Sequence, residues 1–394
     1  MANNCILIHY HEISLKGDNR KWFENVFLQN VKENVRGLPY DRIIITAARL
    51  YIFGIDAGLW DEYSGRLRNV MGLSNATLIV QIPAELPLIK STAESLIVDE
   101  SFDTFRVSAR RQYKNFHLTS MQINQEVGAH IQQIVKKPVK LKGADLEIYI
   151  EIVKGMAYVG FKRITGYGGL PVGVSESAVS LLSSGIDSPV SSFNLMKRGV
   201  SLSFVHFHSA PATNRQSITN VISILKVLSR YQTVCPVYLV PLLEIQQKIM
   251  AETPDKFWVL LFRRAMVKLA GIIADRIDAP ALITGESVGQ VASQTLSNIR
   301  AVAEATSLPI LRPLSGMNKE DIIWQAKDIG TYEISVEPYQ DCCSFFVPAH
   351  PETKANLNII LQIENKIDLS ALLDDALNRS EFFKVNKDGP ITNE

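Results

Sequence analysis

The sequence predicts a multidomain protein of the α+β and α/β classes, in which the C-terminal half is a doubly wound parallel sheet. The chain has 394 residues, more than the roughly 100–200 residues of a single domain. Apolar runs of strand length alternate with helical patterns after about residue 174, and this alternation is typical of a parallel sheet. The glycine-rich segment ITGYGGLPVG, residues 164–173, precedes that half and has the composition of a linker.

Two smaller α+β domains are expected before this linker, at residues 1–82 and 83–165. The first opens with the strand CILIHYHEI and the helix KWFENVFLQNVKENV, followed by a strand pair in IIITAARLYIF. The second combines helices at STAESLIVDE and SMQINQEVGAHIQQIV with strands at TFRVSAR, LEIYIEIV and MAYVGFK.

The third domain is expected at residues 174–394. Its predicted strands are AVSLL, SLSFVHF, VYLVPL and ALIT, and the longest predicted helix is DKFWVLLFRRAMVKLAGIIADRI. The last segment, from about Asn378 to Glu394, is polar, and we expect it to be frayed.

Composition excludes several classes of protein. The chain is 46% hydrophobic and 21% charged, without an apolar run near the roughly 18 residues that span a bilayer. The N-terminus lacks the pattern of a signal peptide, so we expect a cytoplasmic protein with no membrane partner. Four cysteines without a C-x-x-C pair favour neither a disulfide framework nor a zinc site. The net charge of +1 does not decide whether nucleic acid binds, because the position of the charges matters.

The stretch LLSSGIDSPVSSFNLMKRG, Leu181 to Gly199, passes from an apolar strand through a small polar loop into a helix. Such a turn presents free N–H groups at the carboxyl edge of a sheet, which predicts an anion site. The loop matches neither the Walker A nor the dinucleotide-binding pattern. Asp187 suits either Mg²⁺ held by phosphate oxygens or a helix cap. A capping turn without a ligand is the alternative.

The loop, Ser183 to Ser188, is similar to the S-G-G-x-D-S loop of ATP pyrophosphatases, with Ser184 in place of a glycine. These enzymes adenylate a carbonyl oxygen and release pyrophosphate. Serine at this position forfeits easy access to positive φ. Four further stretches, ILIHYHEISLKGDNRKWFE, TSMQINQEVG, GYGGLPVG and TGESVGQVASQT, resemble the tRNA 4-thiouridine synthetase family in the same order.

The resemblance covers about Ile6 to Ala355 and implies an N-terminal ferredoxin-like domain, a THUMP RNA-binding domain and an ATP-pyrophosphatase (PP-loop) domain. It further implies ATP and Mg²⁺ as cofactors, tRNA as the partner and a homodimer. The ATP-binding residues that it implies are Leu181, Leu182, Ser183, Gly185, Asp187, Ser188, His206, Phe207, Arg263, Gly285 and Gln294.

Each of these roles has a structural alternative. Phe207 suits the protein core as well as a nucleoside, Gly285 suits an ordinary turn, and Gln294 suits an exposed helix face. Arg263 lies in the apolar pattern FWVLLFRRAMV, where a guanidinium needs an anionic partner such as phosphate. Its neighbour Arg264 is expected to point toward solvent.

Two adjacent cysteines, Cys342 and Cys343, lie in the loop EPYQDCCSFFVPAHPETKA. Cysteine is usually a small buried hydrophobe, which is the alternative here. The resemblance implies that one cysteine of this loop, with Cys342 favoured, takes part in sulfur transfer. Some members carry a rhodanese domain that bears the persulfide, and this sequence ends at Glu394 without one. We therefore expect a cysteine desulfurase to deliver sulfur directly.

A basic cluster in the second domain predicts an RNA contact, because lysine and arginine bind phosphate backbones. Nearby Tyr113, Phe116 and His117 are expected to be able to stack on bases. A solvated charged face is the alternative. The candidate RNA-binding residues are Arg106, Arg110, Arg111, Lys114, Lys136 and Lys137.

The resemblance implies ATP-dependent formation of 4-thiouridine at uridine 8 of tRNA, through adenylation of the base and attack by persulfide sulfur. It also implies sulfur transfer for thiamine biosynthesis, with a sulfur carrier protein as a further partner. Two other functions stay open at this point. One is an ATP pyrophosphatase that acts on a small molecule, and the other is an RNA-binding protein in which Ser184 has inactivated the loop.

Overall fold

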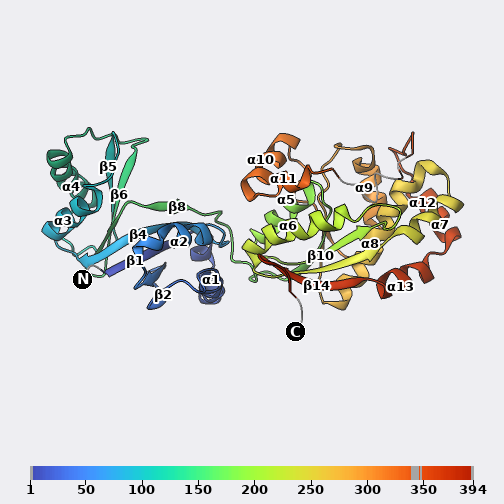
Figure 1. The fold of residues 1–394 in the computed structure, drawn as a ribbon, viewed down its shortest axis with the longest axis horizontal. Helices are drawn as coiled ribbons and strands as arrows, with labels where there is room; N and C mark the ends of the chain where they lie inside the picture. Colours follow the sequence, from blue (N-terminus) through green and yellow to red (C-terminus); the bar gives the residue numbers. More distant parts are fainter. Residues whose placement is uncertain (1–2, 339–345, 347, 392–394) are drawn as a thin grey trace. The chain divides into compact units, whose positions relative to one another are not determined.

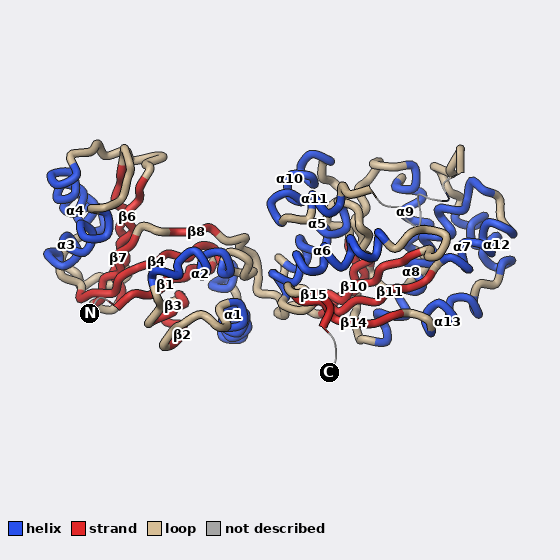
Figure 2. Tube along the Cα trace, in the orientation of Figure 1, coloured by secondary structure: helices blue, strands red, loops and turns tan. Residues whose placement is uncertain are grey.

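The computed structural model describes residues 3–338, 346 and 348–391. The chain forms two compact units that divide between Leu170 and Pro171, inside the glycine-rich segment. Figure 1 and Figure 2 show the elements of each unit. No helix within the described ranges has the length and apolar character that crossing a membrane requires.

The first unit is built on a mixed eight-stranded sheet in the order β2-β3-β1-β4-β7-β6-β5, with β8 paired to β4. Strand β1 is antiparallel to β3 and β4, whereas β5 and β6 are parallel. The strands are β1 (Asn3–Tyr10), β2 (Arg42–Thr46), β3 (Arg49–Phe53), β4 (Leu73–Pro83), β5 (Phe105–Arg111), β6 (Leu146–Val153), β7 (Met156–Gly160) and β8 (Arg163–Thr165). The α-helices are α1 (Arg20–Asn34), α2 (Trp60–Leu67), α3 (Leu86–Ile97) and α4 (Ser120–Val135).

One sheet therefore runs through both of the smaller regions expected from the sequence. Strand β4, which ends at the expected boundary near residue 82, pairs with β7 of the second region. Helix α4 begins with a capping box, in which Thr119 and Gln122 satisfy each other's backbone N–H groups. Its buried residues, among them Ile123 and Val127, share a core with β6 and β7. The boundary between the two regions stays a prediction.

The second unit contains a seven-stranded sheet in the order β13-β12-β9-β10-β11-β14-β15. The first five of these strands are parallel to one another. The strands are β9 (Ser177–Leu181), β10 (Ser201–His208), β11 (Cys235–Pro241), β12 (Leu282–Ile283), β13 (Ile310–Leu311), β14 (Glu381–Asn386) and β15 (Gly389–Ile391). The α-helices are α5 (Asp187–Met196), α6 (Gln216–Gln232), α7 (Leu243–Glu252), α8 (Trp258–Arg276), α9 (Leu296–Ala303), α10 (Lys319–Ile329), α11 (Tyr332–Ser335), α12 (Leu357–Ile367) and α13 (Ser370–Asn378).

Helices cover both faces of this sheet, as adjacent residues of β9 show. Val179 packs in the core that α8 fills, whereas the hydroxyl of Ser180 bonds to Ser192 of α5 at 2.8 Å. Successive strand residues point to opposite faces, so α8 and α5 lie on opposite sides of the sheet. The predicted doubly wound parallel sheet is confirmed.

The expectation of a frayed C-terminal segment is wrong for most of its described length. Strand β14 pairs antiparallel with β11, and β15 pairs with β14. Two apolar residues hold this mostly polar segment on the sheet. Val385 is fully buried, and the ring of Phe382 packs against Tyr238 at 4.7 Å between centroids. An edge hairpin needs few apolar residues, because its strands bury only one face.

Candidate active site

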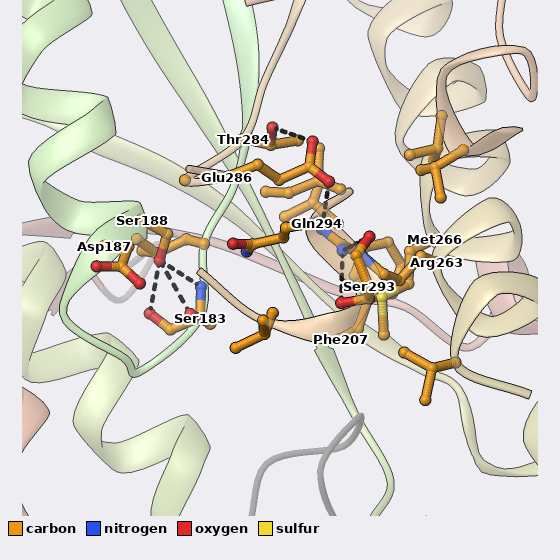
Figure 3. Close-up of a pocket in the computed structure, with 18 of the residues that line it drawn as sticks. Ser183, Asp187, Ser188, Phe207, Arg263, Met266, Thr284, Glu286, Ser293 and Gln294 are labelled. Atoms are coloured by element: carbon orange, nitrogen blue, oxygen red, sulfur yellow. Dashed lines mark hydrogen bonds and ion pairs between the residues drawn. The ribbon is translucent and has the colours of Figure 1, made fainter. Parts of the chain in front are cut away.

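A cavity of about 510 Å³ lies where the parallel strands of the second unit end. It is lined by the ends of β9 and β10, by the start of α5, by one face of α8 and by the segment that follows β12. Ligands of open parallel sheets bind at this edge. Figure 3 shows the cavity, with the serine loop, residues 183–188, and Arg263 at different parts of its wall.

The serine loop between β9 and α5 is closed by its own hydroxyl groups. Ser188 Oγ accepts a hydrogen bond from Ser183 N at 2.9 Å and donates to Ser183 O at 3.1 Å. Ser183 Oγ accepts from Gly185 N at 3.3 Å. These bonds hold the backbone in one shape before a ligand arrives, which favours binding because less ordering is needed.

Ser184 does not strain this loop. Serine would be unfavourable if the position required a positive φ, but Ser184 is absent from the described residues that have one. Its side chain is 1% exposed, and its hydroxyl makes no hydrogen bond within the described residues. The expected backbone cost of serine at this position is therefore absent from the structure.

Asp187 is the first residue of α5, and its carboxylate does not cap the helix. One oxygen, Oδ1, pairs with Lys319 Nζ at 2.6 Å, and the other accepts from Gln290 Nε2 at 2.8 Å. Helix α5 shows no side-chain cap at its N-cap residue, Ile186. The capping alternative for Asp187 is therefore wrong, and the carboxylate is instead held between two side chains beside the cavity.

Gly285 lies against the backbone of the same loop. A Cβ atom at this position would come within 2.7 Å of Ser188 N and 2.8 Å of Ser188 Cα. The neighbouring Thr284 O accepts a hydrogen bond from Ser191 Oγ at 2.8 Å. The small residues of α5 thus let the segment after β12 pack closely on the helix start. Glycine is required here by the loop backbone and not by an ordinary turn.

Arg263 finds its anionic partner within the protein. Its guanidinium pairs with Glu286 Oε1 at 2.5 Å and donates to Ser293 Oγ at 3.0 Å. Figure 3 shows this pair, with Thr284 Oγ1 also donating to the carboxylate at 2.9 Å. The carboxylate additionally pairs with Arg312 Nε at 2.6 Å. Two cations on one anion leave a net positive charge beside the cavity, which suits a polyphosphate.

Glu286 is 3% exposed, and its environment keeps it charged. Burial alone would raise the pKa of this carboxyl, but Arg263 and Arg312 outweigh burial and hold the pKa below its usual value. Four residues of this network were not predicted from the sequence, namely Glu286, Arg312, Gln290 and Lys319. Glu286 and Gln290 lie in the TGESVGQVASQT stretch, which was singled out, whereas Lys319 reaches Asp187 from a helix 132 positions away in the chain.

The expectation for Arg264 is wrong, because this side chain is 1% exposed. It pairs with Glu364 Oε2 at 2.7 Å and with Glu304 Oε2 at 2.9 Å, and it also donates to Ala301 O. Two acids, distant in sequence, supply the charges that a buried guanidinium needs. The two adjacent arginines of α8 therefore differ in their surroundings. Arg263 lines the cavity, whereas Arg264 connects α8 to α9 and α12 through its hydrogen bonds and ion pairs.

The other end of the cavity is apolar. Phe207 is 6% exposed and belongs both to the core and to the cavity wall, so the two alternatives for it are compatible. In Figure 3 the side chain of Gln294 lies between the serine loop and Arg263, and its Oε1 makes no hydrogen bond within the described residues. Of the predicted ATP-binding residues, the cavity is lined by Leu181, Leu182, Ser183, Asp187, Ser188, His206, Phe207, Arg263, Gly285 and Gln294. Gly185 lies in the loop but not in the lining.

His206 is buried beside the loop, and its Nδ1 bonds to Leu182 O at 2.9 Å. A carbonyl only accepts, so Nδ1 carries the proton of the neutral ring and Nε2 is left as an acceptor. Burial lowers the pKa of His206 to about 4, although the bond to Leu182 opposes this.

This shift predicts a loss of stability in acid. The unfolded chain takes up a proton near the ordinary pKa of 6.5, whereas the folded chain does so only near 4. Stability should therefore decrease as the pH falls from 6.5 toward 4. Urea midpoints at pH 7 and pH 5 should differ less in His206→Gln than in the parent protein, and equal differences in both proteins would contradict the assignment.

Cys342 and Cys343 lie outside the described residues. Phe346, three positions after Cys343, packs its ring edge-on against Phe262 of α8, with 6.4 Å between centroids. Farther along, Pro351 lines the cavity. The chain that follows the cysteine pair therefore contacts the helix and the cavity that carry the predicted ATP-binding residues.

The basic residues of the first unit divide into two groups. Arg106 pairs with Glu147, Arg111 donates to the carbonyl of Phe116 at 2.7 Å, and Lys137 lies over the ring of Phe102 at 4.2 Å. These three side chains therefore make contacts within the first unit itself. The exposed residues of the predicted set are Arg110, Lys114 and Lys136. Phe116 is 6% exposed in the core, so the expectation that it can stack on bases is wrong.

Comparison with known proteins identifies the family of this chain. The family model "Thiamine biosynthesis protein (ThiI)" matches residues 173–369, "ThiI ferredoxin-like domain" matches residues 5–77, and "THUMP domain" matches residues 83–162. A "Probable tRNA sulfurtransferase" of Moorella thermoacetica is 38% identical over 98% of this chain and 99% of its own length. The chain belongs to the ThiI family.

Two further comparisons cover nearly the whole chain. A "Probable tRNA sulfurtransferase" of Halothermothrix orenii is 38% identical over 96% of this chain and 98% of its own length. Among solved structures, a crystal structure of a 4-thiouridine synthetase–RNA complex with bound ATP is 34% identical. It covers 97% of this chain and 99% of its own, with a TM-score of 0.86. The resemblance stated from the sequence is confirmed.

Proposed function

We propose that this member of the ThiI family is a tRNA sulfurtransferase that uses ATP to convert a tRNA uridine to 4-thiouridine. The observation that carries the proposal is the cavity at the carboxyl ends of the parallel strands. It joins a preshaped serine loop and Asp187 to an apolar wall that suits a nucleobase. Relatives that match nearly the whole chain are named "Probable tRNA sulfurtransferase", and the solved relative of similar fold is a 4-thiouridine synthetase in complex with RNA and ATP.

The first step activates the base. The 4-oxygen of uridine attacks the α-phosphorus of ATP, the bond from that phosphorus to the bridging oxygen breaks, and pyrophosphate leaves while the base loses its N3 proton. The serine loop donates backbone N–H groups to the phosphates, and Arg263 and Lys319 supply positive charge. Stabilising the charge that develops on the phosphates is the main demand on such a site.

The second step exchanges oxygen for sulfur. The terminal sulfur of a persulfide on Cys342 or Cys343 attacks C4, the C4–O bond breaks, and AMP departs. The other thiolate then attacks the inner sulfur, which leaves the terminal sulfur on C4 and joins the two cysteines in a disulfide. A thiol reductant must restore the pair for another turnover. A cysteine desulfurase is the proposed source of the persulfide.

Mg²⁺ is proposed as part of the substrate, bound to the triphosphate. Within the described ranges no three His, Cys, Asp or Glu side chains form a cluster that could hold a metal ion unaided. Asp187, beside the serine loop, is a single carboxylate that would complete the coordination of a phosphate-bound ion. Mg²⁺ usually binds in this way, through one or two carboxylates together with substrate phosphates. When bound, the ion neutralises charge on the phosphates.

We also propose the finer features that the family resemblance implies. These are uridine 8 as the target, a homodimer, a cytoplasmic location and a second role in sulfur transfer for thiamine biosynthesis through a sulfur carrier protein. A base in a structured tRNA must leave its stack to reach the cavity, so the first unit is proposed to hold the tRNA while the base enters.

The exposed basic residues of the first unit should control tRNA affinity. Arg110→Ala with Lys114→Ala should weaken binding and lower the slope of log K against log salt by about one for each residue. The matched control is Lys387→Ala, an exposed lysine of the second unit. Filter binding at several salt concentrations measures both quantities. An unchanged slope would remove these residues from the RNA surface.

Release of pyrophosphate that depends on tRNA tests the proposed function. Protein, ATP and Mg²⁺ should release little pyrophosphate alone, and unmodified tRNA should stimulate the release. Stimulation by a small molecule but not by tRNA would favour the other type of pyrophosphatase. Binding of tRNA without any nucleotide binding would favour the RNA-binding protein with an inactive loop.

A further inference from the structure

One buried carboxylate connects three segments of the cavity wall. Glu286 lies just after β12, is 3% exposed and lines the cavity. Its Oε2 accepts from Thr284 Oγ1 at 2.9 Å and from Arg312 Nε at 2.6 Å. Its Oε1 pairs with Arg263 Nη2 at 2.5 Å. One oxygen is therefore fixed by residues that follow β12 and β13, and the other is left for the arginine of α8.

Arg263 is held at both of its terminal nitrogens. While Nη2 pairs with Glu286, Nη1 donates to Ser293 Oγ at 3.0 Å, as Figure 3 shows. All three residues line the cavity. An arginine side chain has many rotamers, so a single orientation needs such partners. A guanidinium has more N–H donors than these bonds use, and donors therefore remain for a nucleotide.

Neither stability nor charge explains an acid at this position. A buried ion pair adds little stability compared with apolar residues of similar volume. The negative charge of Glu286 also offsets part of the positive charge that Arg263 and Arg312 place beside the cavity. A buried acid is expected in an anion site where it fixes the orientation of a group that contacts the ligand.

We propose that Glu286 is a positioning residue for the adenylation step: it orients Arg263 toward the nucleotide. The inference rests on the proposed function, in which the cavity binds ATP. The alternative is that Glu286 only offsets the charge of the two arginines. Glu286→Gln separates these roles, because it removes the charge and keeps the size. Loss of offsetting charge would strengthen ATP binding, whereas loss of orientation would weaken it.

For Glu286→Gln we expect weaker binding of Mg·ATP, measured by calorimetry without tRNA. We also expect kcat/KM for tRNA-dependent release of pyrophosphate to fall roughly tenfold, the factor that corresponds to one hydrogen bond to a charged group. The matched control is Glu304→Gln, which removes an acidic partner from the adjacent Arg264. It should leave both quantities at the parent values. Equal or tighter binding of ATP by Glu286→Gln would overturn the inference.

A double-mutant cycle tests whether Glu286 acts through Arg263. Arg263→Met should itself lower kcat/KM, and Arg312 still neutralises Glu286 in this variant. Adding Glu286→Gln to Arg263→Met should then change kcat/KM by less than about twofold, because the group that the carboxylate orients is already absent. A further tenfold loss in this background would show that Glu286 acts without Arg263 and would overturn the proposal.

A second pair of variants decides the question if Glu286→Gln does not fold. Thr284→Val removes the hydroxyl that holds Oε2 of Glu286, whereas Thr284→Ser keeps it. We expect Thr284→Val to lower kcat/KM by a smaller factor than Glu286→Gln, and Thr284→Ser to restore the parent value. A parent value in Thr284→Val, or a loss that Thr284→Ser does not restore, would count against the positioning role.

Failure of the proposed function would give a different result. A parent protein that binds Mg·ATP but releases no pyrophosphate with tRNA would contradict the sulfurtransferase proposal. The orientation of Arg263 by Glu286 would still be tested, because the effect of Glu286→Gln on ATP binding is measured without tRNA.

Discussion

Replacing Gly285 with alanine should weaken ATP binding and slow the adenylation step by roughly a hundredfold, because a displacement of about 1 Å at a reacting site can change the rate by this factor. The added Cβ atom would lie 2.7 Å from Ser188 N and 2.9 Å from the carbonyl carbon of Asp187. Both are backbone atoms of the α5 start, so the clash cannot be relieved by rotating a side chain. The loop itself must move, and the phosphate-binding N–H groups must move with it.

Calorimetric titration with Mg·ATP measures the loss of binding, and tRNA-dependent release of pyrophosphate measures the loss of rate. Gly316→Ala supplies a matched control. Gly316 lies in the same unit, and a Cβ atom there would meet nothing within 4 Å. Gly316→Ala should therefore bind ATP as the parent does. If Gly285→Ala also bound ATP normally, the serine loop would not be the part of the cavity that holds the nucleotide.

Arg264→Met should lower the free energy of unfolding by about 3 kcal/mol, because it leaves Glu364 buried without its main partner. Glu364 is 9% exposed and keeps only Lys268, at 2.9 Å, as an ion-pair partner among the described residues. Denaturant unfolding at pH 7 measures the loss. Glu304→Gln, at the 44% exposed end of the same network, should cost less than about 1 kcal/mol.

The size of this loss should depend on pH. Burial would raise the pKa of Glu364, but the hydrogen bonds from Arg264 and Lys268 outweigh it and hold the pKa below the ordinary 4.5. A carboxyl with a lowered pKa stabilises the fold above the ordinary value and loses this contribution as the pH falls through the folded pKa. The difference between parent and Arg264→Met should therefore narrow below about pH 4.5. A difference that stays constant would show that lost packing, and not charge, is responsible.

The sequence predicted the parts of the site that are local in the chain. Strand β9, the serine loop and helix α5 follow one another directly between Ser177 and Met196, so the pattern Leu181 to Ser188 contained the essential information. The same holds for the parallel sheet, whose strands are short apolar runs. Ten of the eleven predicted ATP-binding residues line one cavity, although ATP contact for each residue stays a prediction.

The parts that depend on distant partners could not be read from the sequence. Arg263 and Arg264 are adjacent and chemically identical, and only the positions of Glu286 and Glu364 decide which one faces the cavity. Lys319 meets Asp187 because α10 packs beside α5, and no local pattern announces such an ion pair. The burial of Phe116 could not be predicted for the same reason, because it follows from the packing of α3 and α4 on the sheet.

Transfer of sulfur from the cysteine pair to an ATP-activated tRNA base can be followed in an assay of the complete reaction. The protein is incubated with unmodified tRNA, ATP, Mg²⁺, a cysteine desulfurase and cysteine, and the near-ultraviolet absorbance of 4-thiouridine is followed for the parent, Cys342→Ser and Cys343→Ser. We expect thiolated tRNA from the parent and its loss in at least one variant. Thiolation at the parent rate in both variants would contradict sulfur transfer through this pair, and tRNA binding without thiolation in the parent would contradict the sulfurtransferase assignment.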